Sequence, residues 1–352
     1  MLRRTFLQSV SAAAVAAGQA AGERARLGID IYSIRSFRWK AMQLLDYSAR
    51  LGLNTIQISS IGEYESLEPA YLKKVRDHAD RLGIAMDAGI GCICPTSASF
   101  NPKSGDPAKT LAQGLEVAKA VGAKAMRCFM GSAADRRGKL PMEAHMEATI
   151  KVFRSVRSRA LDLGVQIALE NHGDLESVEM KTILDQSGKE FAGCCYDSGN
   201  PVLVLEDPMF TLEILAPYVA SSHFRDTALF ERPDGAAFQW VALGEGTTNI
   251  EAVLRRFRQL CPRAPVQLEI ITGRRPAPLS YLEPGFWKAF PKMDAASFAR
   301  FVALVKKGQP FAGSMMTAGA GKQPPEYEAA VKEQQRVDLE RSIEFAKKVL
   351  WS

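Results

Sequence analysis

The sequence has no long hydrophobic run and little histidine. A helix that crosses a bilayer needs about 20 predominantly apolar residues, whereas the Ala-rich stretch close to the N-terminus is shorter and only mildly hydrophobic. We therefore predict no stable insertion into a membrane. The 352 residues include only 4 histidines, which excludes sites built from many imidazole ligands.

The sequence also lacks a block of one charge. The formal net charge is +6, and the 45 Lys and Arg residues are scattered among 39 acids. A nucleic-acid-binding surface needs a basic stripe or patch, so we predict no nucleic-acid partner. The 6 cysteines lie mostly in apolar runs such as "AMRCFM" and "FAGCCYD", where a thiol packs as a small hydrophobic group. No disulfide framework is predicted.

What the sequence does contain is a regular alternation of short and long segments. From residue 27 onward, short runs rich in Val, Ile and Leu alternate with longer amphipathic stretches. This is the pattern of parallel strands that alternate with helices. The eight predicted strands lie at 27–32, 55–59, 84–90, 123–130, 165–171, 191–197, 219–226 and 266–272.

The stretches between the strands are predicted to be helices that end on glycine. "KAMQLLDYSARLGL" and "PAYLKKVRDHADRLG" are two examples, and a Gly just after a helix readily takes the left-handed conformation that ends it. No Gly-rich phosphate loop of the kind found in open doubly wound sheets follows the first strand. We therefore predict the α/β class and a (β/α)₈ TIM barrel, which needs about 250 residues, with a C-terminal helical extension.

Both ends of the chain fall outside this repeat. Residues 1–22 contain "RRTFL" followed by an Ala-rich stretch and resemble a twin-arginine signal peptide, which predicts a periplasmic or otherwise extracytoplasmic protein. The barrel is then expected at 23–275 and the extension at 276–352. Aromatic residues at the start of the extension, including Tyr281 and Trp287, are predicted either to border the barrel mouth or to pack on the outer helices.

Polar residues end four successive strands. In a (β/α)₈ barrel the reacting residues come from the carboxyl ends of the strands, and Glu170, Asp197, His223 and Glu269 lie there on the predicted fifth to eighth strands. A buried carboxylate or imidazole is costly unless it is neutralised or coordinated, so four in succession predict one shared metal ion. Three carboxylates and one imidazole favour Mn²⁺, Mg²⁺ or Co²⁺ and also permit Zn²⁺.

These four residues lie in phrases that resemble a known family. "ALENH", "YDSGN", "SHFRD", "LGEGTTNIEAVL" and "LEI" are similar to the motifs of xylose-isomerase-like sugar isomerases and epimerases, above all the tagatose and psicose 3-epimerase branch. The resemblance implies that Glu170, Asp197, His223 and Glu269 bind one divalent metal, and that Glu170 and Glu269 are the catalytic acid and base. Such enzymes remove a proton next to a carbonyl and form an enediolate.

Neighbouring residues are candidates for substrate binding. His172 follows the fifth strand, and Arg225 lies beside the metal-binding histidine, where it could hold a substrate hydroxyl or pair with an acid. Asp226 is predicted either to contact substrate or to orient that histidine. Asn200 stands where the 3-epimerase branch has a substrate-binding histidine, and Gln57 stands where many relatives have glutamate. These departures predict a substrate different from that of the 3-epimerases.

The predicted function is isomerisation or epimerisation of a small-molecule carbohydrate. A non-phosphorylated sugar or keto-sugar is favoured, because phosphorylated metabolites are scarce outside the cytoplasm. A 3-keto-glycoside lyase or hydratase would use the same metal and base, and this alternative stays open, as does a non-catalytic, metal-stabilised carbohydrate-binding barrel. Apurinic endonucleases share the barrel but need many histidines for their zinc ions, and His78 and His145 are expected on helix surfaces. A homo-oligomer is compatible with the sequence.

Overall fold

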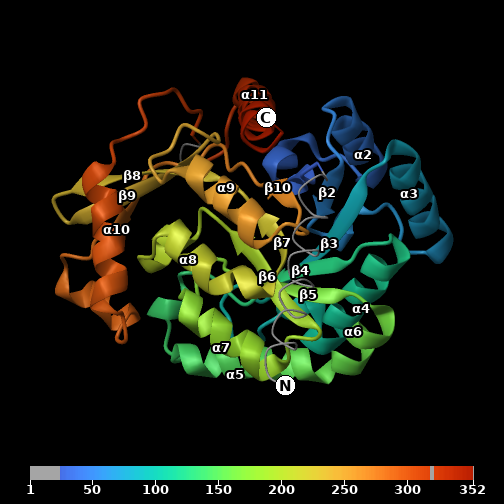
Figure 1. The fold of residues 1–352 in the computed structure, drawn as a ribbon, viewed down its shortest axis with the longest axis horizontal. Coiled ribbons are helices and arrows are strands. Elements are labelled where there is room, and N and C mark those ends of the chain that lie inside the picture. The colour runs from blue at the N-terminus through green and yellow to red at the C-terminus, as the bar shows by residue number, and fades with distance from the viewer. Residues whose placement is uncertain (1–23, 318–320, 352) are drawn as a thin grey trace, which may run out of the picture.

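Eight parallel strands form the centre of the molecule, which confirms the predicted barrel (Figure 1). The structure, a computed structural model, describes residues 24–317 and 321–351. The predicted signal peptide at 1–22 lies outside the described residues. The barrel strands are β1 (Leu27–Asp30), β2 (Thr55–Ile58), β3 (Ala85–Cys92), β4 (Ala125–Phe129), β5 (Gln166–Glu170), β6 (Ala192–Asp197), β7 (Val219–His223) and β10 (Val266–Leu268).

The sheet runs in the order β10-β1-β2-β3-β4-β5-β6-β7, and neighbouring strands are parallel. Phe224 joins its two ends: its N–H donates to the carbonyl of Gln267 at 2.7 Å, and its carbonyl accepts from the N–H of Glu269 at 2.9 Å. Closure in this way pairs backbone groups that an open sheet would leave exposed at its edges. It also places the end of β7 beside the end of β10.

Helices follow the strands and cover the outside of the barrel (Figure 1). The predicted glycines end them: Gly52, Gly83 and Gly164 have φ of 68°, 67° and 63°, the left-handed region that glycine adopts without a steric cost. The helices are α2 (Ala41–Arg50), α3 (Pro69–Leu82), α4 (Pro107–Ala120), α5 (Met142–Ser155), α6 (Arg157–Leu163), α7 (Ser177–Ser187), α8 (Pro208–Leu215) and α9 (Ile250–Leu260).

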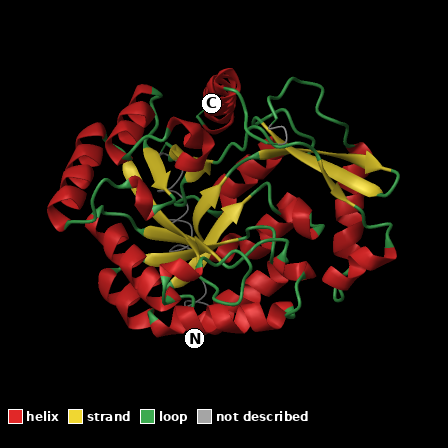
Figure 2. Ribbon diagram, turned by 180° about the vertical axis from the view of Figure 1, so that it is seen from behind, coloured by secondary structure: helices red, strands yellow, loops and turns green. Residues whose placement is uncertain are grey.

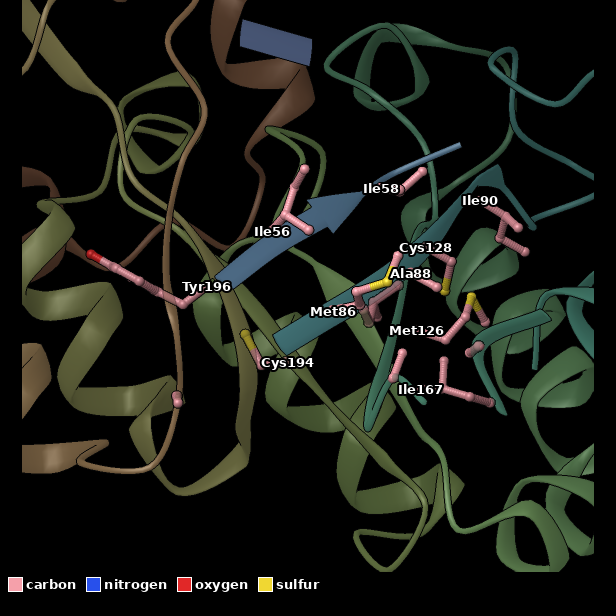
Figure 3. Packing of buried hydrophobic residues seen from close by; sticks show 14 of the residues in the cluster. Ile56, Ile58, Met86, Ala88, Ile90, Met126, Cys128, Ile167, Cys194 and Tyr196 are labelled. Carbon is pink, nitrogen blue, oxygen red and sulfur yellow. The ribbon is translucent and has the colours of Figure 1, made fainter. Parts of the chain in front are cut away.

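Side chains that alternate along the strands form the main hydrophobic core. Ile56, Ile58, Met86 and Ala88 belong to it (Figure 3), together with helical residues such as Leu72. Because successive strand residues point to opposite faces, these apolar residues pack between strands and helices, and the residues between them point into the barrel.

The barrel interior is unusually polar. Gln57 of β2 donates to the hydroxyl of Ser221 in β7 at 2.8 Å, and that hydroxyl donates to Asp87 in β3 at 2.7 Å. All three side chains are buried. The contacts join strands that are not neighbours in the sheet, so the side chains meet inside the barrel. This network lies next to the histidine at the end of β7.

A second, small sheet lies beside the barrel and was not predicted (Figure 2). Residues that follow β7 form a hairpin of β8 (Asp226–Arg232) and β9 (Gly235–Val241), and β11 (Ala277–Leu279) pairs antiparallel with β9. The hairpin lies within the residues assigned to the barrel and β11 lies within the predicted extension. The extension therefore shares a sheet with an insertion of the barrel.

The small sheet has its own hydrophobic core. Helix α10 (Ala295–Lys307) packs against β8, and Phe301 and Leu229 are fully buried between them. Tyr281 and Trp287 pack in this second core. Neither residue is among those that line the cavity at the barrel mouth, and neither packs on the outer helices of the barrel, so both predicted positions are wrong, because the small sheet and α10 provide a separate apolar core.

The last helix, α11 (Pro325–Leu350), packs on the barrel as the predicted helical extension. Its side chains hold loops that follow three different strands. Gln335 accepts from the N–H of Ser36 at 3.0 Å, and Asp338 accepts from the hydroxyl of Thr272 at 2.7 Å. Arg341 forms a 2.7 Å ion pair with Glu245. The helix therefore fixes loops at the end of the barrel that carries the strand carboxyl ends.

In the described ranges, no helix combines the length and apolar character needed to cross a membrane.

The 6 cysteines are all free, and 5 of them are buried, as expected for thiols that pack as hydrophobic groups.

Candidate metal centre and active site

The four predicted ligands converge at one end of the barrel. Glu170, Asp197 and His223 end β5, β6 and β7, and Glu269 follows β10 directly. One ligand atom from each lies within 4.8 Å of all the others, and all four side chains are buried. Ligands of a single ion, bonded at about 2.0 to 2.6 Å, lie no more than about twice that length apart. The cluster has the dimensions of a one-metal site.

A hydrogen bond across the barrel orients His223. Its Nε2 lies against Oε1 of Gln57, and the amide nitrogen of Gln57 donates to Ser221 at 2.8 Å. Because that amide nitrogen is engaged, the amide oxygen faces the histidine and accepts from Nε2–H. The lone pair of the ring then lies on Nδ1, the atom that faces the carboxylates.

The Nδ1 atom of His223 is buried and has no hydrogen-bond partner among the described residues. It lies 3.4 Å from Glu269, 3.5 Å from Glu170 and 3.9 Å from Asp197. Burial alone would lower the pKa of His223, but the neighbouring Cys195 thiol and the carboxylates of Glu269, Glu170 and Asp30 raise it well above its ordinary value. The cluster therefore attracts positive charge at the point where its four ligand atoms meet.

Two arginines balance part of the negative charge. Arg127 of β4 lies against Oε2 of Glu170, and Nη2 of Arg225 lies against Asp197 and Glu269. Burial alone would raise the pKa of both glutamates, but the adjacent guanidiniums lower it below the ordinary value. Both glutamates are therefore ionised at neutral pH and suited to bind a cation.

Asp197 is held by the backbone that follows it. Its Oδ1 accepts from the N–H groups of Gly199 and Asn200 at 2.7 and 3.0 Å, which leaves Oδ2 directed at the cluster. Asn171 bridges to its backbone with two further hydrogen bonds of 2.7 and 2.8 Å. Burial raises the pKa of Asp197 to about 6, although Arg225 opposes the shift.

A cavity of about 500 Å³ borders the cluster, which is within the range of about 300 to 1,000 Å³ for small-molecule sites. Of the four clustered residues only Glu269 lines it, whereas Glu170 is fully buried behind Arg127 and Asn200. The cavity is lined by Tyr32, Ser59, Ser60, Arg127, Phe129, Ser132, Ala133, Ala134, His172, Asn200, Leu203, Arg225, Trp240, Glu269, Ile271 and Arg274.

Arg225 lies between the hairpin and the chain that follows β6. Its guanidinium lies 4.8 Å from the ring centroid of Trp240 in β9, and the Trp240 indole N–H donates to the carbonyl of Gly199 at 3.2 Å. A Cβ on Gly199 would lie 2.2 Å from Cγ of Arg225. Only glycine therefore lets Arg225 lie across this turn and reach the carboxylates.

His172 lies in the cavity wall, as does Asn200. The ring of His172 stacks on Phe129 with centroids 4.2 Å apart, and its Nδ1 lies 2.8 Å from the carbonyl of Gly131. Asn200 donates to Oε1 of Glu170 at 3.3 Å. The predicted substrate-binding residues His172, Asn200 and Arg225 thus border one cavity.

Asp226 does not take the position expected for it. Its carboxylate accepts from the N–H groups of Gly244 and Gly246 and from the hydroxyl of Thr248, at 2.9 to 3.0 Å. It is 1% exposed and is not among the residues that line the cavity. The expectation that Asp226 orients His223 is wrong, because Gln57 occupies that position and the Asp226 oxygens hold the loop after β9.

Several cavity residues were missed in the sequence. Tyr32, Phe129, Trp240 and Arg274 were not among the candidates, although each lines the cavity. Phe129 had a visible signal, since it is the penultimate residue of the fourth predicted strand and alternation places it on the same face as Arg127. Arg274 had none, because it lies in a loop whose path depends on the small sheet.

Comparisons with known proteins agree with this architecture. The family described as "Xylose isomerase-like TIM barrel" matches residues 45–287. Among curated proteins, the 3-oxo-isoapionate decarboxylase of Pectobacterium atrosepticum is 24% identical over 245 residues, which cover 66% of this chain and 80% of that protein.

Two solved structures illustrate the shared fold. The D-psicose 3-epimerase of Clostridium cellulolyticum H10 is 12% identical and superposes with a TM-score of 0.57 over 92% of this chain and 99% of its own. The 3-keto-D-glucoside 4-epimerase of E. coli is also 12% identical, with a TM-score of 0.55 over 80% of this chain and 100% of its own. Identities this low establish the fold and nothing about the substrate.

Proposed function

Because this chain belongs to the xylose isomerase-like TIM barrel family, we propose that it is a metal-dependent isomerase or epimerase of a non-phosphorylated sugar or keto-sugar. The observation that carries the proposal is the convergence of four ligand atoms within 4.8 Å of one another. The Nδ1 atom of His223 supports it, because this buried atom faces three carboxylates without a hydrogen bond among the described residues and is stabilised there by a bound cation, either a proton or a metal ion.

The donor set fits a divalent metal. Glu170, Asp197 and Glu269 would supply carboxylate oxygens and His223 would supply Nδ1. Such a set suits Mn²⁺, Mg²⁺ or Co²⁺ and also Zn²⁺. When bound, the metal would supply Lewis-acid stabilisation of the negative charge that develops when a proton leaves the carbon next to a carbonyl.

The geometry favours Glu269 as the base. It is the one clustered carboxylate that lines the cavity, and Arg225 keeps it ionised. A base must lie within hydrogen-bond reach of the proton that it removes, and Glu269 meets this condition for a sugar in the cavity. Return of a proton to the same face restores the centre, return from the other face inverts it, and return to the neighbouring carbon moves the carbonyl.

Glu170 is proposed as the second acid–base group, from a different strand. Its Oε2 is held by Arg127, and its Oε1 lies 3.3 Å from the amide nitrogen of Asn200. Asn200 is therefore placed to hold a substrate hydroxyl and Oε1 of Glu170 at once. The cavity wall of His172 on Phe129 and Trp240 gives the sugar ring an apolar surface and keeps water from part of the site.

A lyase that acts on a keto-sugar derivative is the second candidate. Glu269 would remove the same proton, and the electrons would then expel a substituent one carbon further along instead of accepting a new proton. The curated relative is named as a decarboxylase of a 3-oxo acid, so bond cleavage next to a keto group is known for a protein similar to this one. The cavity of about 500 Å³ leaves room for a leaving group.

Proton exchange in D₂O tests the proposal. The protein, with its metal content analysed, is incubated with ketohexoses and 3-keto-glucosides, and deuterium entry next to the carbonyl is followed by NMR. We expect metal-dependent exchange. Inversion would identify an epimerase, aldose formation an isomerase, and aglycone release a lyase. Binding without exchange for any substrate would favour a carbohydrate-binding barrel and would contradict the proposal.

The variant Glu269→Gln tests the base. At saturating metal, we expect exchange to slow by about 10²- to 10⁴-fold, the usual contribution of a general base. The control is Glu251→Gln, on the exposed face of α9, which should exchange at the wild-type rate. Full exchange by metal-loaded Glu269→Gln would rule out this carboxylate as the base.

A further inference from the structure

Two arginines of adjoining loops form no ion pair among the described residues, and one of them, Arg274, lines the cavity. Arg274 lines the cavity and is exposed, and Arg35 lies in the segment that follows β1. In the described ranges neither forms an ion pair, whereas the nearby acid Glu63 is paired with Lys40 at 3.0 Å. Surface arginines of a protein with many acidic residues usually form ion pairs. Two neighbouring arginines that form none therefore indicate a binding site for an anion.

Arg35 is fixed in position without using its charge. Its guanidinium donates to the carbonyl of Thr272 at 2.7 Å and to that of Tyr32 at 3.2 Å, and it lies 4.6 Å from the ring centroid of Tyr32. Tyr32 lines the cavity beside Arg274. These contacts tie the loop after β1 to the loop after β10 and hold the guanidinium of Arg35 beside Tyr32, which lines the cavity.

The two arginines repel each other. Burial is the largest cause that lowers the pKa of Arg35, the positive charge of Arg274 lowers it further, and Tyr32 and Glu269 oppose the shift. Two like charges held on adjoining loops cost free energy that a bound anion would remove. A ligand with a negative group would therefore be bound most favourably beside these two arginines.

The carboxylates of Glu170, Asp197 and Glu269, in the cluster that borders the cavity, are already matched by positive charge and cannot neutralise the two arginines. Three carboxylates there are opposed by Arg127 and Arg225, and a divalent ion would leave one positive charge in excess.

Asp30 lies 3.5 Å from the His223 ring, is buried and does not line the cavity. Glu269 is the one acid among the described residues that line the cavity, and it faces Arg225, so no lining carboxylate is left to neutralise Arg274.

We propose that the substrate is an acidic keto-sugar, with a carboxylate that Arg274 and Arg35 bind while its carbonyl end faces Glu269. This inference rests on the proposed function, in which the sugar carries no phosphate, and a carboxylate is the anionic group that remains. Arginine forks bind carboxylates with two parallel hydrogen bonds, so the two arginines would also set which end of the sugar reaches the metal.

The test compares ligands that differ in one group. Wild-type protein with analysed metal content is titrated by calorimetry with a ketohexose and with the ketohexuronate that has a carboxylate in place of the terminal hydroxymethyl group. We expect the ketohexuronate to bind about tenfold more tightly or better, the usual effect of a charge-assisted hydrogen bond. In Arg274→Gln the two affinities should converge. The control Arg275→Gln changes the next residue, which is exposed but does not line the cavity, and should keep the preference.

Three results would overturn the inference: equal affinity of the wild type for the two ligands, a preference that survives in Arg274→Gln, or tighter binding of a ketohexose phosphate than of the ketohexuronate. Deuterium exchange in the same samples separates the two proposals. Exchange of neutral sugars without a preference for the acid would leave the function standing and remove the inference. A preference for the ketohexuronate that depends on Arg274, without any exchange, would support the acidic ligand and contradict the proposed catalytic function.

Discussion

Gln57 is the residue that decides which nitrogen of His223 faces the carboxylates. We predict that Gln57→Met, which keeps the shape of the side chain but removes the acceptor, lowers metal affinity about 10- to 100-fold, the usual effect of losing a hydrogen bond to a ligating histidine. Competition with a chromophoric chelator measures this affinity.

Gln267→Met is a matched control. Gln267 is also fully buried inside the barrel, but its amide donates to Thr55 at 2.9 Å rather than contacting His223. Its variant should bind metal with the wild-type affinity. Equal losses in both variants would show that any polar deletion in the interior loosens the site, and the special role of Gln57 would be refuted.

At the residue scale, the sequence predicts ligands better than it predicts their partners. Glu170 and Asp197 were recognisable because a carboxylate ends an otherwise apolar strand, which is a local signal. The partner of His223 lies 166 residues away across the barrel, and no local pattern indicates it. Asp226 was misassigned for this reason: it is close to His223 in sequence, but its side chain points to the loop after β9.

Among the elements, α11 is held by apolar side chains that belong to the barrel core. Leu339 is fully buried there. We predict that Leu339→Ala lowers the free energy of unfolding by about 2 to 5 kcal/mol, because it removes buried methyl groups and leaves a cavity. Val337, two residues earlier, is 40% exposed, and Val337→Ala should change stability by no more than about 0.5 kcal/mol. Denaturant unfolding of both variants checks this, and similar losses would mean that α11 is not anchored through Leu339.

A carboxyl group at the start of α7 makes the free energy of unfolding depend on pH. Glu176 caps this helix and lies 3.3 Å from Arg136, and burial, reinforced by Glu179, raises its pKa from 4.5 to about 7. The folded protein therefore holds this proton more tightly than the unfolded chain does. The stabilisation is complete below about pH 4.5 and is lost as the pH rises to about 7.

We predict that Glu176→Gln lacks this dependence. The free energy of unfolding of the wild type minus that of the variant should fall between pH 4.5 and 7, by at most about 1.4 kcal/mol per pH unit. Unfolding curves of both proteins across this range give the difference directly, and a difference that does not vary with pH would contradict the prediction.

At the scale of elements, the barrel strands were predictable as short apolar runs between amphipathic stretches. Four of them, β2 to β5, also follow a glycine that ends the preceding helix in the left-handed conformation: Gly52, Gly83, Gly122 and Gly164. The hairpin of β8 and β9 was missed, although "RPDG" between two alternating runs is a turn signal. These residues lie between the seventh and eighth predicted strands, where the βα repeat predicts a helix rather than a hairpin. The pairing of β11 with β9 could not be read from the sequence, since a three-residue strand has no periodicity of its own.

For the whole molecule, export stays a prediction. Residues 1–22 lie outside the described residues, and the twin-arginine motif there predicts transport of the folded protein. Replacing Arg3 and Arg4 by lysine should keep the protein in the cytoplasm, as cell fractionation with an antibody would show. Mass spectrometry of the exported wild type should find an N-terminus near residue 22. Unchanged export of the double variant would refute the twin-arginine route.

The small sheet affects how mutation can alter the substrate specificity of this protein. The proposed metal ligands belong to the barrel, whereas Trp240, and through the loop to β11 also Arg274, depend on a sheet with its own hydrophobic core. Mutations within residues 226–241 and 274–308 that keep Trp240, which contacts Arg225 and Gly199, would therefore reshape one wall of the cavity while the clustered carboxylates stay in place. These two segments form a natural cassette: exchanged together between homologues, or randomised together in a library, they would redirect specificity while the catalytic centre is inherited intact.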